Sequence, residues 1–336
     1  MISRSILLLI ALVASVPAAA QHHGGTSKVA DGAPVTLYTD ALGSWTWPVS
    51  TASAEAQAYF SQGVKLMFAF TPPDARRSFE EARRRDPECA MCWWGEAWSM
   101  GPYLNGGMKP EDAAAAYAAA RHAAELVTAR GTDVERALVE AMLARYAGSH
   151  PEGGRKGLDS AFAAAMEAVY ARFPDDLQVA ALYADALMVL EPRRGVWPVD
   201  KPSVARIHQV LARALESHVG HPGVCHSYIH ATETTPRAGQ AQACADLLVT
   251  NMPGASHLNH MPSHTYNRVG RWNDAVQSNV IAWASDRRAA EGTALSIYPT
   301  HNLHMLMFAA SMDGQAGRAM EAADAYAAMT PGGDGA

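Results

Sequence analysis

The sequence predicts an all-α protein, a solenoid of stacked helix pairs, on three observations. Hydrophobic residues make up 49% of the 336-residue chain, and many of them are alanine, which favours helices and lets them approach closely. Runs of β-branched residues are few. The chain also resembles itself at a spacing of about 34 residues, a period typical of helical repeats. We therefore expect about seven helix pairs that form a superhelix with a concave groove.

The clearest repeat unit begins at Ala56. When Ala56 is counted as position 1, aromatic residues stand at positions 4 and 24, small residues at 8, 20 and 27, and proline at 32; these are Tyr59, Phe79, Gly63, Ala75, Ala82 and Pro87. Small residues let the two helices touch, aromatic residues fill the space between pairs, and proline ends the second helix. This pattern resembles the tetratricopeptide repeat (TPR).

Later units follow the same frame with insertions. They begin at Ala90, Thr132, Leu177, Pro222, Ser256 and near Thr300. Extra residues stand at 101–105, at 191–201 and before the seventh unit. We expect TPR-like repeats 1–4 over residues 55–221, repeats 5–7 over residues 222–329, and a disordered tail at 330–336.

The first twenty residues predict export. Arg4 precedes the apolar run 6–16, and small residues stand before a cleavage point ahead of Gln21, as in a signal peptide. Residues 21–54 look irregular, and no later apolar run has the length of a membrane span. We expect a periplasmic or secreted protein. The net charge of −6 argues against nucleic acid as a partner, and a groove suits a small molecule, a peptide or a protein partner.

The four cysteines are disulfide candidates because an exported protein meets an oxidising environment. Cys225 and Cys244 fall on the two helices of the fifth unit, which favours a bridge between them. Cys89 and Cys92 form a C-x-x-C without the βαβ context of a redox motif. The alternative is a set of buried free thiols.

Seven of the fourteen histidines fall in three short blocks. The blocks are His226 and His230 with Glu233; His257, His260 and His264; and His301 and His304. Spacings of three or four place the members of a block on one helix face. In the repeat frame the histidines take positions 2, 5 and 9 of the first helix of their units. Those positions line the groove in TPR proteins, so the resemblance implies that all three blocks face one cavity.

Helix geometry limits how these side chains share an ion. Residues i and i+4 lie about 6 Å apart along the axis and can chelate one metal, whereas residues i and i+7 lie about 10 Å apart and cannot. A site must therefore combine pairs from neighbouring helices. The set is large enough for one metal with supporting residues, or for two metals.

Copper is the favoured metal, with zinc and iron as alternatives, because imidazole ligands suit all three. Glu233 would be a ligand, or a catalytic base near a bound water or substrate. This pattern favours a metal-dependent oxidoreductase over a zinc hydrolase. The alternatives are a metal-handling protein without turnover, a peptide-binding TPR adaptor, and a hydrogen-bonded histidine network without metal.

Four further residues are candidates for the groove. Trp94, Trp98 and Asp185 take groove positions in the repeat frame and would form a wall for an organic substrate or peptide. Packing between repeats is the alternative for both tryptophans. His221 precedes Pro222 at a helix start, where capping is favoured over ligation.

The phrases DPECAMCWWGEAWSMGPYLN, HPGVCHSYIHATE, HMPSHTYNRVGRWNDA and YPTHNLHMLM resemble a group of exported bacterial TPR proteins, largely uncharacterised. The likeness spans most of the chain. It implies that His221, Glu233 and most of the block histidines act as one functional unit, but it brings no activity with it.

Overall fold

A computed structural model describes residues 35–193 and 195–330, and the regular secondary structure there is helical. The helices are α1 (Ala54–Phe68), α2 (Pro72–Arg85), α3 (Ala90–Met100), η1 (Pro110–Asp112), α4 (Ala113–Arg130), α5 (Asp133–Leu143), α6 (Lys156–Arg172), α7 (Leu177–Met188), α8 (Pro202–Ser217), α9 (Pro222–Glu233), η2 (Ala238–Ala241), α10 (Gln242–Asn251), α11 (Ser256–His260), α12 (Pro262–Val269), α13 (Trp272–Ala289), α14 (Pro299–Met312) and α15 (Ala316–Met329). Over the described residues there are isolated β-bridges but no strand. The predicted all-α class is confirmed.

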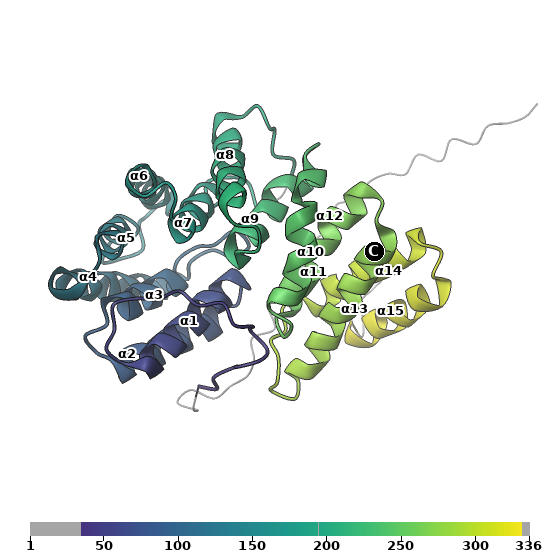
Figure 1. The fold of residues 1–336 in the computed structure, drawn as a ribbon, viewed down its shortest axis with the longest axis horizontal. Coiled ribbons are helices and arrows are strands. Elements are labelled where there is room, and N and C mark those ends of the chain that lie inside the picture. The colour runs from purple at the N-terminus through teal and green to yellow at the C-terminus, as the bar shows by residue number, and fades with distance from the viewer. Residues whose placement is uncertain (1–34, 194, 331–336) are drawn as a thin grey trace, which may run out of the picture.

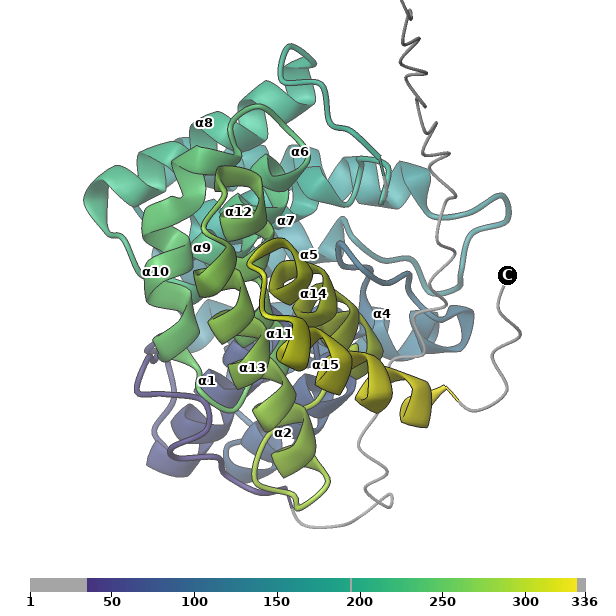
Figure 2. The same ribbon diagram turned by 90° about the vertical axis from the view of Figure 1, so that its right-hand side faces the viewer.

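The helices pack in chain order as stacked pairs, from α1 with α2 to α14 with α15 (Figure 1). In the sixth pair the first helix is divided into α11 and α12, which meet at Met261 and Pro262. Proline has no N–H to donate inside a helix, which explains the break. At the carboxyl-terminal end α14 packs against both α13 and α15, and α15 is the outermost helix toward the viewer in Figure 2.

The repeat signature has a direct packing reason. Phe79 on α2 is fully buried and fits against the backbones of α1 and α3. A Cβ atom placed on Gly63 or Gly95 would lie 2.6 or 2.4 Å from the Phe79 ring. Glycine at these two positions therefore lets one aromatic side chain fill the space between three helices.

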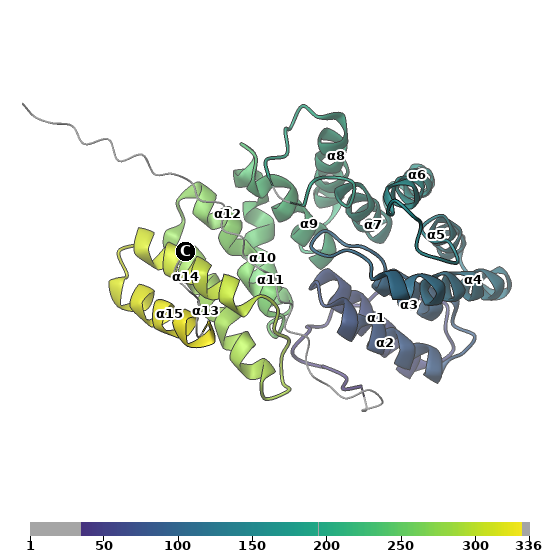
Figure 3. The same cartoon turned by 180° about the vertical axis from the view of Figure 1, so that it is seen from behind.

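The superhelix turns far enough to bring the first pair beside the fifth. Helix α1 contacts α9, although well over a hundred residues separate them (Figures 1 and 3). The short connection between α1 and α2, with Phe70, reaches the histidine-bearing helices there. The first repeat pair therefore forms part of the surroundings of the histidines.

Residues 35–53 form an irregular segment that packs on the first repeats. Trp47 contacts the rings of Phe60 and Trp94 at centroid distances of 5.5 and 5.8 Å. The signal peptide expected at residues 1–20 lies outside the described residues, and so does the expected tail beyond Thr330. No described helix has the length and apolar character needed to cross a membrane.

Two disulfides join the four cysteines. Cys225–Cys244 connects α9 to α10, and Cys89–Cys92 lies at the start of α3. All four side chains are buried. The first bridge fixes the two helices of the fifth pair next to the histidines of α9.

Candidate metal centre

Six of the predicted histidines come together in two groups of three. The groups are His226, His230 and His257, and His260, His264 and His301. Within each group one ring nitrogen from every member lies within 4.8 Å of the others. The first group joins α9 to α11, and the second joins α11, α12 and α14. Each group therefore takes its members from more than one helix, as the helix geometry required.

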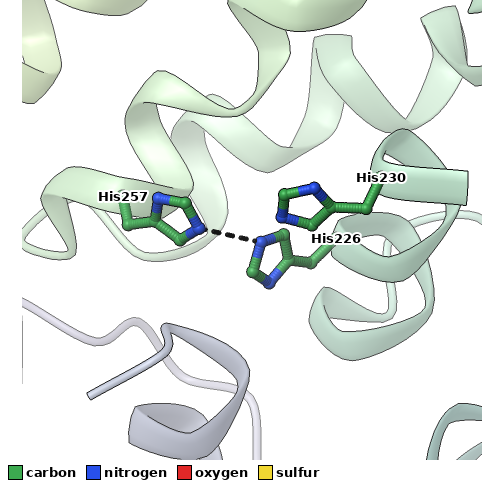
Figure 4. Close-up of side chains that lie close together, drawn as sticks. All are labelled: His226, His230 and His257. Carbon is green, nitrogen blue, oxygen red and sulfur yellow. Dashed lines mark hydrogen bonds between the residues drawn. The ribbon is translucent and has the colours of Figure 1, made fainter. Parts of the chain in front are cut away.

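In the first group the rings of His226 and His257 approach most closely. Their Nε2 atoms are 3.2 Å apart (Figure 4). His226 Nδ1 donates to the Phe68 carbonyl at 2.6 Å, and His230 Nδ1 lies 2.9 Å from Glu233 Oε1. His230 Nε2 and His257 Nδ1 are buried and have no hydrogen-bond partner among the described residues.

In the second group His260 and His264 face each other with their Nε2 atoms 2.8 Å apart. His260 Nδ1 lies 2.7 Å from Asn279 Oδ1, and Asn279 Nδ2 donates to the Ala275 carbonyl at 2.8 Å. His264 Nδ1 bonds to Glu233 Oε2. His301 completes the group, its ring centroid 4.7 Å from that of His260.

These contacts determine which ring nitrogens carry a proton. A backbone carbonyl and an ionised carboxylate only accept hydrogen bonds, and the Asn279 amide presents its oxygen because its nitrogen is used elsewhere. The Nδ1 atoms of His226, His230, His260 and His264 are therefore donors. In the neutral imidazole the Nε2 atom then holds a lone pair. Four lone pairs are turned into the two groups, which is the arrangement that ligating histidines commonly have.

Burial keeps the rings of His226, His257 and His260 neutral. His226 and His257 are 2% exposed and His260 is 0% exposed. Burial first, and then the neighbouring histidines, hold the pKa of each of these three well below the ordinary value of 6.5. Neutral imidazole is the form that can bind a metal ion, so these three rings are in the form suited to ligation at neutral pH.

Among the hydrogen bonds described above, Glu233 is the carboxylate that contacts the histidine groups. It belongs to neither group of three, because its Oε1 meets His230 and its Oε2 meets His264. Burial alone would raise the pKa of Glu233, but His264 and His230 outweigh it and hold that pKa well below the usual range. In this geometry both carboxylate oxygens of Glu233 are engaged by histidines, one from each group.

Two strained residues pack on the first group. Phe70 and Tyr298 are the non-glycine residues with positive φ in the described chain, both at 59°. The Phe70 ring stacks on His230 and His257, and the Tyr298 ring meets His257 edge-on at 5.5 Å. Such backbone conformations are costly and concentrate at functional sites.

Two of the predicted site residues, His304 and Trp94, lie away from both histidine groups. His304 on α14 is exposed and belongs to neither group. Trp94 is 1% exposed and donates to the Leu138 carbonyl at 3.1 Å, so it packs between repeats and offers no wall to a ligand. Its face is covered by Trp47 from the amino-terminal segment.

Three other predicted residues lie near the first group. Trp98 and Asp185 line a small cavity next to His226. Burial raises the pKa of Asp185 to about 6, which Arg145 partly opposes. His221 caps α9, because its Nδ1 accepts from Val224 N at 3.1 Å.

A larger cavity of about 320 Å³ opens beside both groups. Its walls include Arg193, Trp197 and Tyr298, none of which the repeat frame identifies. All three stand in segments that interrupt the 34-residue repeat. Those interruptions are visible in the sequence and could have identified these residues as candidates. The cavity gives a small molecule access to His230, His264 and the histidines around them.

The fold and these groups define a class, an all-helical repeat protein with paired histidine clusters on its concave side. No family model matches the chain, and no curated protein matches it. Among solved structures it is similar to PilW, a widely conserved type IV pilus biogenesis factor. That likeness has a TM-score of 0.39 and 12% identity over 84% of this chain and 97% of PilW. At these values nothing about the site carries over.

Proposed function

We propose that the chain binds two transition-metal ions, one in each group of three histidines. The observation that carries the proposal is the approach of His260 Nε2 to His264 Nε2 at 2.8 Å. Both rings have their Nδ1 atoms committed as donors. Two lone pairs at that distance repel each other unless a metal ion lies beside them or one ring takes up an additional proton. A metal ion in the group removes the conflict.

The spacing in the first group also suits a shared ion. Metal–nitrogen bonds of about 2.0–2.1 Å in a tetrahedral site place two ligand nitrogens roughly 3.3 Å apart. The His226 and His257 Nε2 atoms are 3.2 Å apart. His230 Nε2, buried without a partner among the described residues, supplies the third ligand. In each group all three ligand nitrogens lie within 4.8 Å of one another, so a side-chain adjustment brings the third to the ion.

Copper is the metal that this ligand set favours. Each group offers imidazole alone, and divalent affinity for such sites rises to copper. Iron in its common oxygenase site takes two histidines and a carboxylate, and here the carboxylate of Glu233 is engaged by two rings. Zinc fits three imidazoles with an open position and is the second choice.

The proximity of the two groups supports an oxidoreductase. The His257 and His260 ring centroids are 6.0 Å apart and those of His230 and His264 are 6.4 Å apart, so two ions would be close neighbours. Two one-electron metals together exchange two electrons with a bound molecule, and the adjacent cavity admits one. The residues that hold the ions are the six histidines, with Glu233, Asn279 and the Phe68 carbonyl orienting them.

A protein that hands metal on would expose its ligands for transfer. Here His226, His257 and His260 are almost inaccessible, which favours a resident metal and turnover over metal handling. We further propose export to the periplasm or beyond, where the two disulfides are stable.

Elemental analysis of untagged protein tests the proposal. After reconstitution with Cu(II), Zn(II) or Fe(II), the wild type should hold about two ions per chain, copper most tightly. The double variant His230→Ala/His264→Ala removes one ligand from each group and should lose both ions while keeping its helical circular dichroism. The matched control His304→Ala should keep both. Absence of bound metal in the reconstituted wild type, or full metal content in the double variant, would contradict the site.

The copper form separates an enzyme from a metal-handling protein. If the centre is redox-active, its optical spectrum should change on reduction and return when dioxygen or peroxide is added. A spectrum that does not respond to either reagent would argue for metal handling.

A further inference from the structure

Three segments that break the repeat meet at the large cavity. They are residues 101–109 between α3 and η1, residues 189–193 and 195–201 between α7 and α8, and residues 290–298 between α13 and α14. We call them the insert loops. Each lines the 320 Å³ cavity: the first with Leu104 and Asn105, the second with Arg193 and Trp197, and the third with Tyr298. The histidines supply the rest of the wall.

The first two insert loops are held together. Residues 103 and 106 close a tight turn with two backbone hydrogen bonds of 2.9 and 3.0 Å. The Arg193 guanidinium then donates to the Asn105 carbonyl across the two loops. Trp197 Nε1 donates to the Pro192 carbonyl at 3.0 Å, and Glu191 accepts from Lys201 and Ser203 at 2.6 Å each. This part of the wall is therefore pre-organised.

The third insert loop is held by hydrogen bonds to neighbouring helices and loops. Leu295 N donates to the Gly254 carbonyl at 2.8 Å, and Asp286 accepts from Ser296 and Asn302 at 2.7 and 2.8 Å. Tyr298 follows in its positive-φ conformation and places its ring on His257. A bound molecule would meet a shaped wall and would not have to order the loops itself, which favours affinity.

The charges around the cavity favour an anion. The charged side chains on its wall are Arg193 and Glu233. Both oxygens of Glu233 already accept hydrogen bonds from histidines, so the carboxylate is engaged away from a bound molecule. Arg193 uses one of its five N–H donors for the Asn105 carbonyl, and a guanidinium can present a planar pair of donors to a carboxylate. Bound metal ions would add further positive charge.

The remaining surface is apolar and aromatic. Leu104 and Trp197 are buried to more than nine-tenths, and Tyr298 adds a third flat or apolar face. A volume of about 320 Å³ is at the small end of ligand sites. We propose that this cavity binds a small aromatic carboxylate, with the carboxylate against Arg193 and the ring along Trp197 and Leu104. The proposal rests on the metal-binding function, because the cavity presents that molecule to the histidine groups.

Isothermal titration calorimetry of metal-loaded protein with benzoate tests this inference. The variant Arg193→Gln should weaken benzoate binding at least tenfold, because a charge-assisted hydrogen bond is lost, and its metal content should stay unchanged. The control Arg121→Gln, on the exposed side of α4, should bind benzoate like the wild type. Benzamide, the neutral analogue, should bind the wild type more weakly than benzoate and should not distinguish wild type from Arg193→Gln.

Three results would overturn it. The first is no detectable benzoate binding to the metal-loaded wild type. The second is equal benzoate affinity in Arg193→Gln, which would mean that the metal alone holds the carboxylate. The third is inorganic phosphate binding more tightly than benzoate, which would mean that the cavity selects a phosphoryl anion. Metal content is measured separately on the same samples. A failure of the metal-binding proposal would therefore appear as missing metal, whereas a failure of the carboxylate-binding proposal would appear as unchanged benzoate affinity in Arg193→Gln.

Discussion

His230 on α9 and His264 on α12 bond to opposite oxygens of the same carboxylate, that of Glu233. This shared contact sets the tautomer of one member of each histidine group and places both Nε2 atoms on the inner side. The two groups are therefore coupled through one residue that is itself in neither. A change at Glu233 should affect both ions.

Substitution of Glu233 by glutamine is the sharpest test of that coupling. The amide has one acceptor and one NH2 group, so only one histidine can keep its Nδ1–H bond. The other must turn a lone pair toward the amide and carry its proton on Nε2, which blocks ligation. We expect metal affinity to fall about 10- to 100-fold, the usual cost of losing such an outer contact.

The measurement is a competition titration against a chelator of known affinity. Glu216→Gln, an exposed change on α8, serves as the control and should leave both ions in place. If Glu233→Gln bound both ions with wild-type affinity, Glu233 would have no orienting role.

The disulfide between α9 and α10 should contribute more stability than the C-x-x-C bridge. Cys225 and Cys244 are 19 residues apart, and Cys89 and Cys92 only 3. On the chain-entropy model, loss of the longer loop costs about 3 kcal/mol and loss of the shorter about 2 kcal/mol. Urea unfolding of Cys225→Ala/Cys244→Ala and of Cys89→Ala/Cys92→Ala checks the order. The reverse order would show that native-state effects outweigh loop length.

Asp185 should make stability depend on pH. The pKa of Asp185 is about 6 in the folded chain against an ordinary value of 3.8, so between these values the folded state holds the proton and the unfolded state does not. Stability then falls as pH rises through this window. Asp185→Asn removes the effect, and the variant should gain stability relative to wild type at pH 7.5 and little at pH 4. Denaturant midpoints at both pH values provide the test, and an equal difference at the two would refute it.

Trp94 should matter for folding and leave metal binding intact. It is buried and its indole N–H bonds to the Leu138 carbonyl. Trp94→Ala should cost about 3–5 kcal/mol, as large-to-small core changes do, while the folded fraction keeps two ions. Trp94→Phe provides a milder version if the alanine variant does not fold. A stable Trp94→Ala protein with altered ligand binding would place this residue at the groove after all.

The repeat spacing was enough to predict the fold because the same few positions decide the packing of every pair. Phe79 between Gly63 and Gly95 is the plainest case. The spacing also placed six histidines on one side of the chain. It could not place Trp94, whose position in the frame matches that of His226, because Trp47 from outside the repeats covers it.

The rest of the site depends on features that a periodic pattern cannot carry. The Phe68 carbonyl that bonds His226 is a backbone atom, 158 positions away in sequence. Whether Glu233 ligates or orients depends on ångström-scale distances between α9 and α12. Arg193 and Tyr298 lie in insert loops, to which the frame assigns no position. His304 is on the same helix as His301, but it faces solvent.

Metal binding should stabilise the contact between the first and fifth repeats. In the proposed site His226 would ligate through Nε2 while its Nδ1–H bonds to the Phe68 carbonyl, so an ion in the first group would fix both sides of the ring. At a free metal concentration of about 100 times Kd, one site adds about 2.7 kcal/mol to the folded state. We expect thermal unfolding, followed by circular dichroism, to move to higher temperature with added Cu(II). The double variant His230→Ala/His264→Ala should show no such shift, and His304→Ala should show all of it. If the wild type held two ions and its unfolding temperature did not move, the ions would bind the unfolded chain equally well, and a site built by the folded superhelix would be excluded.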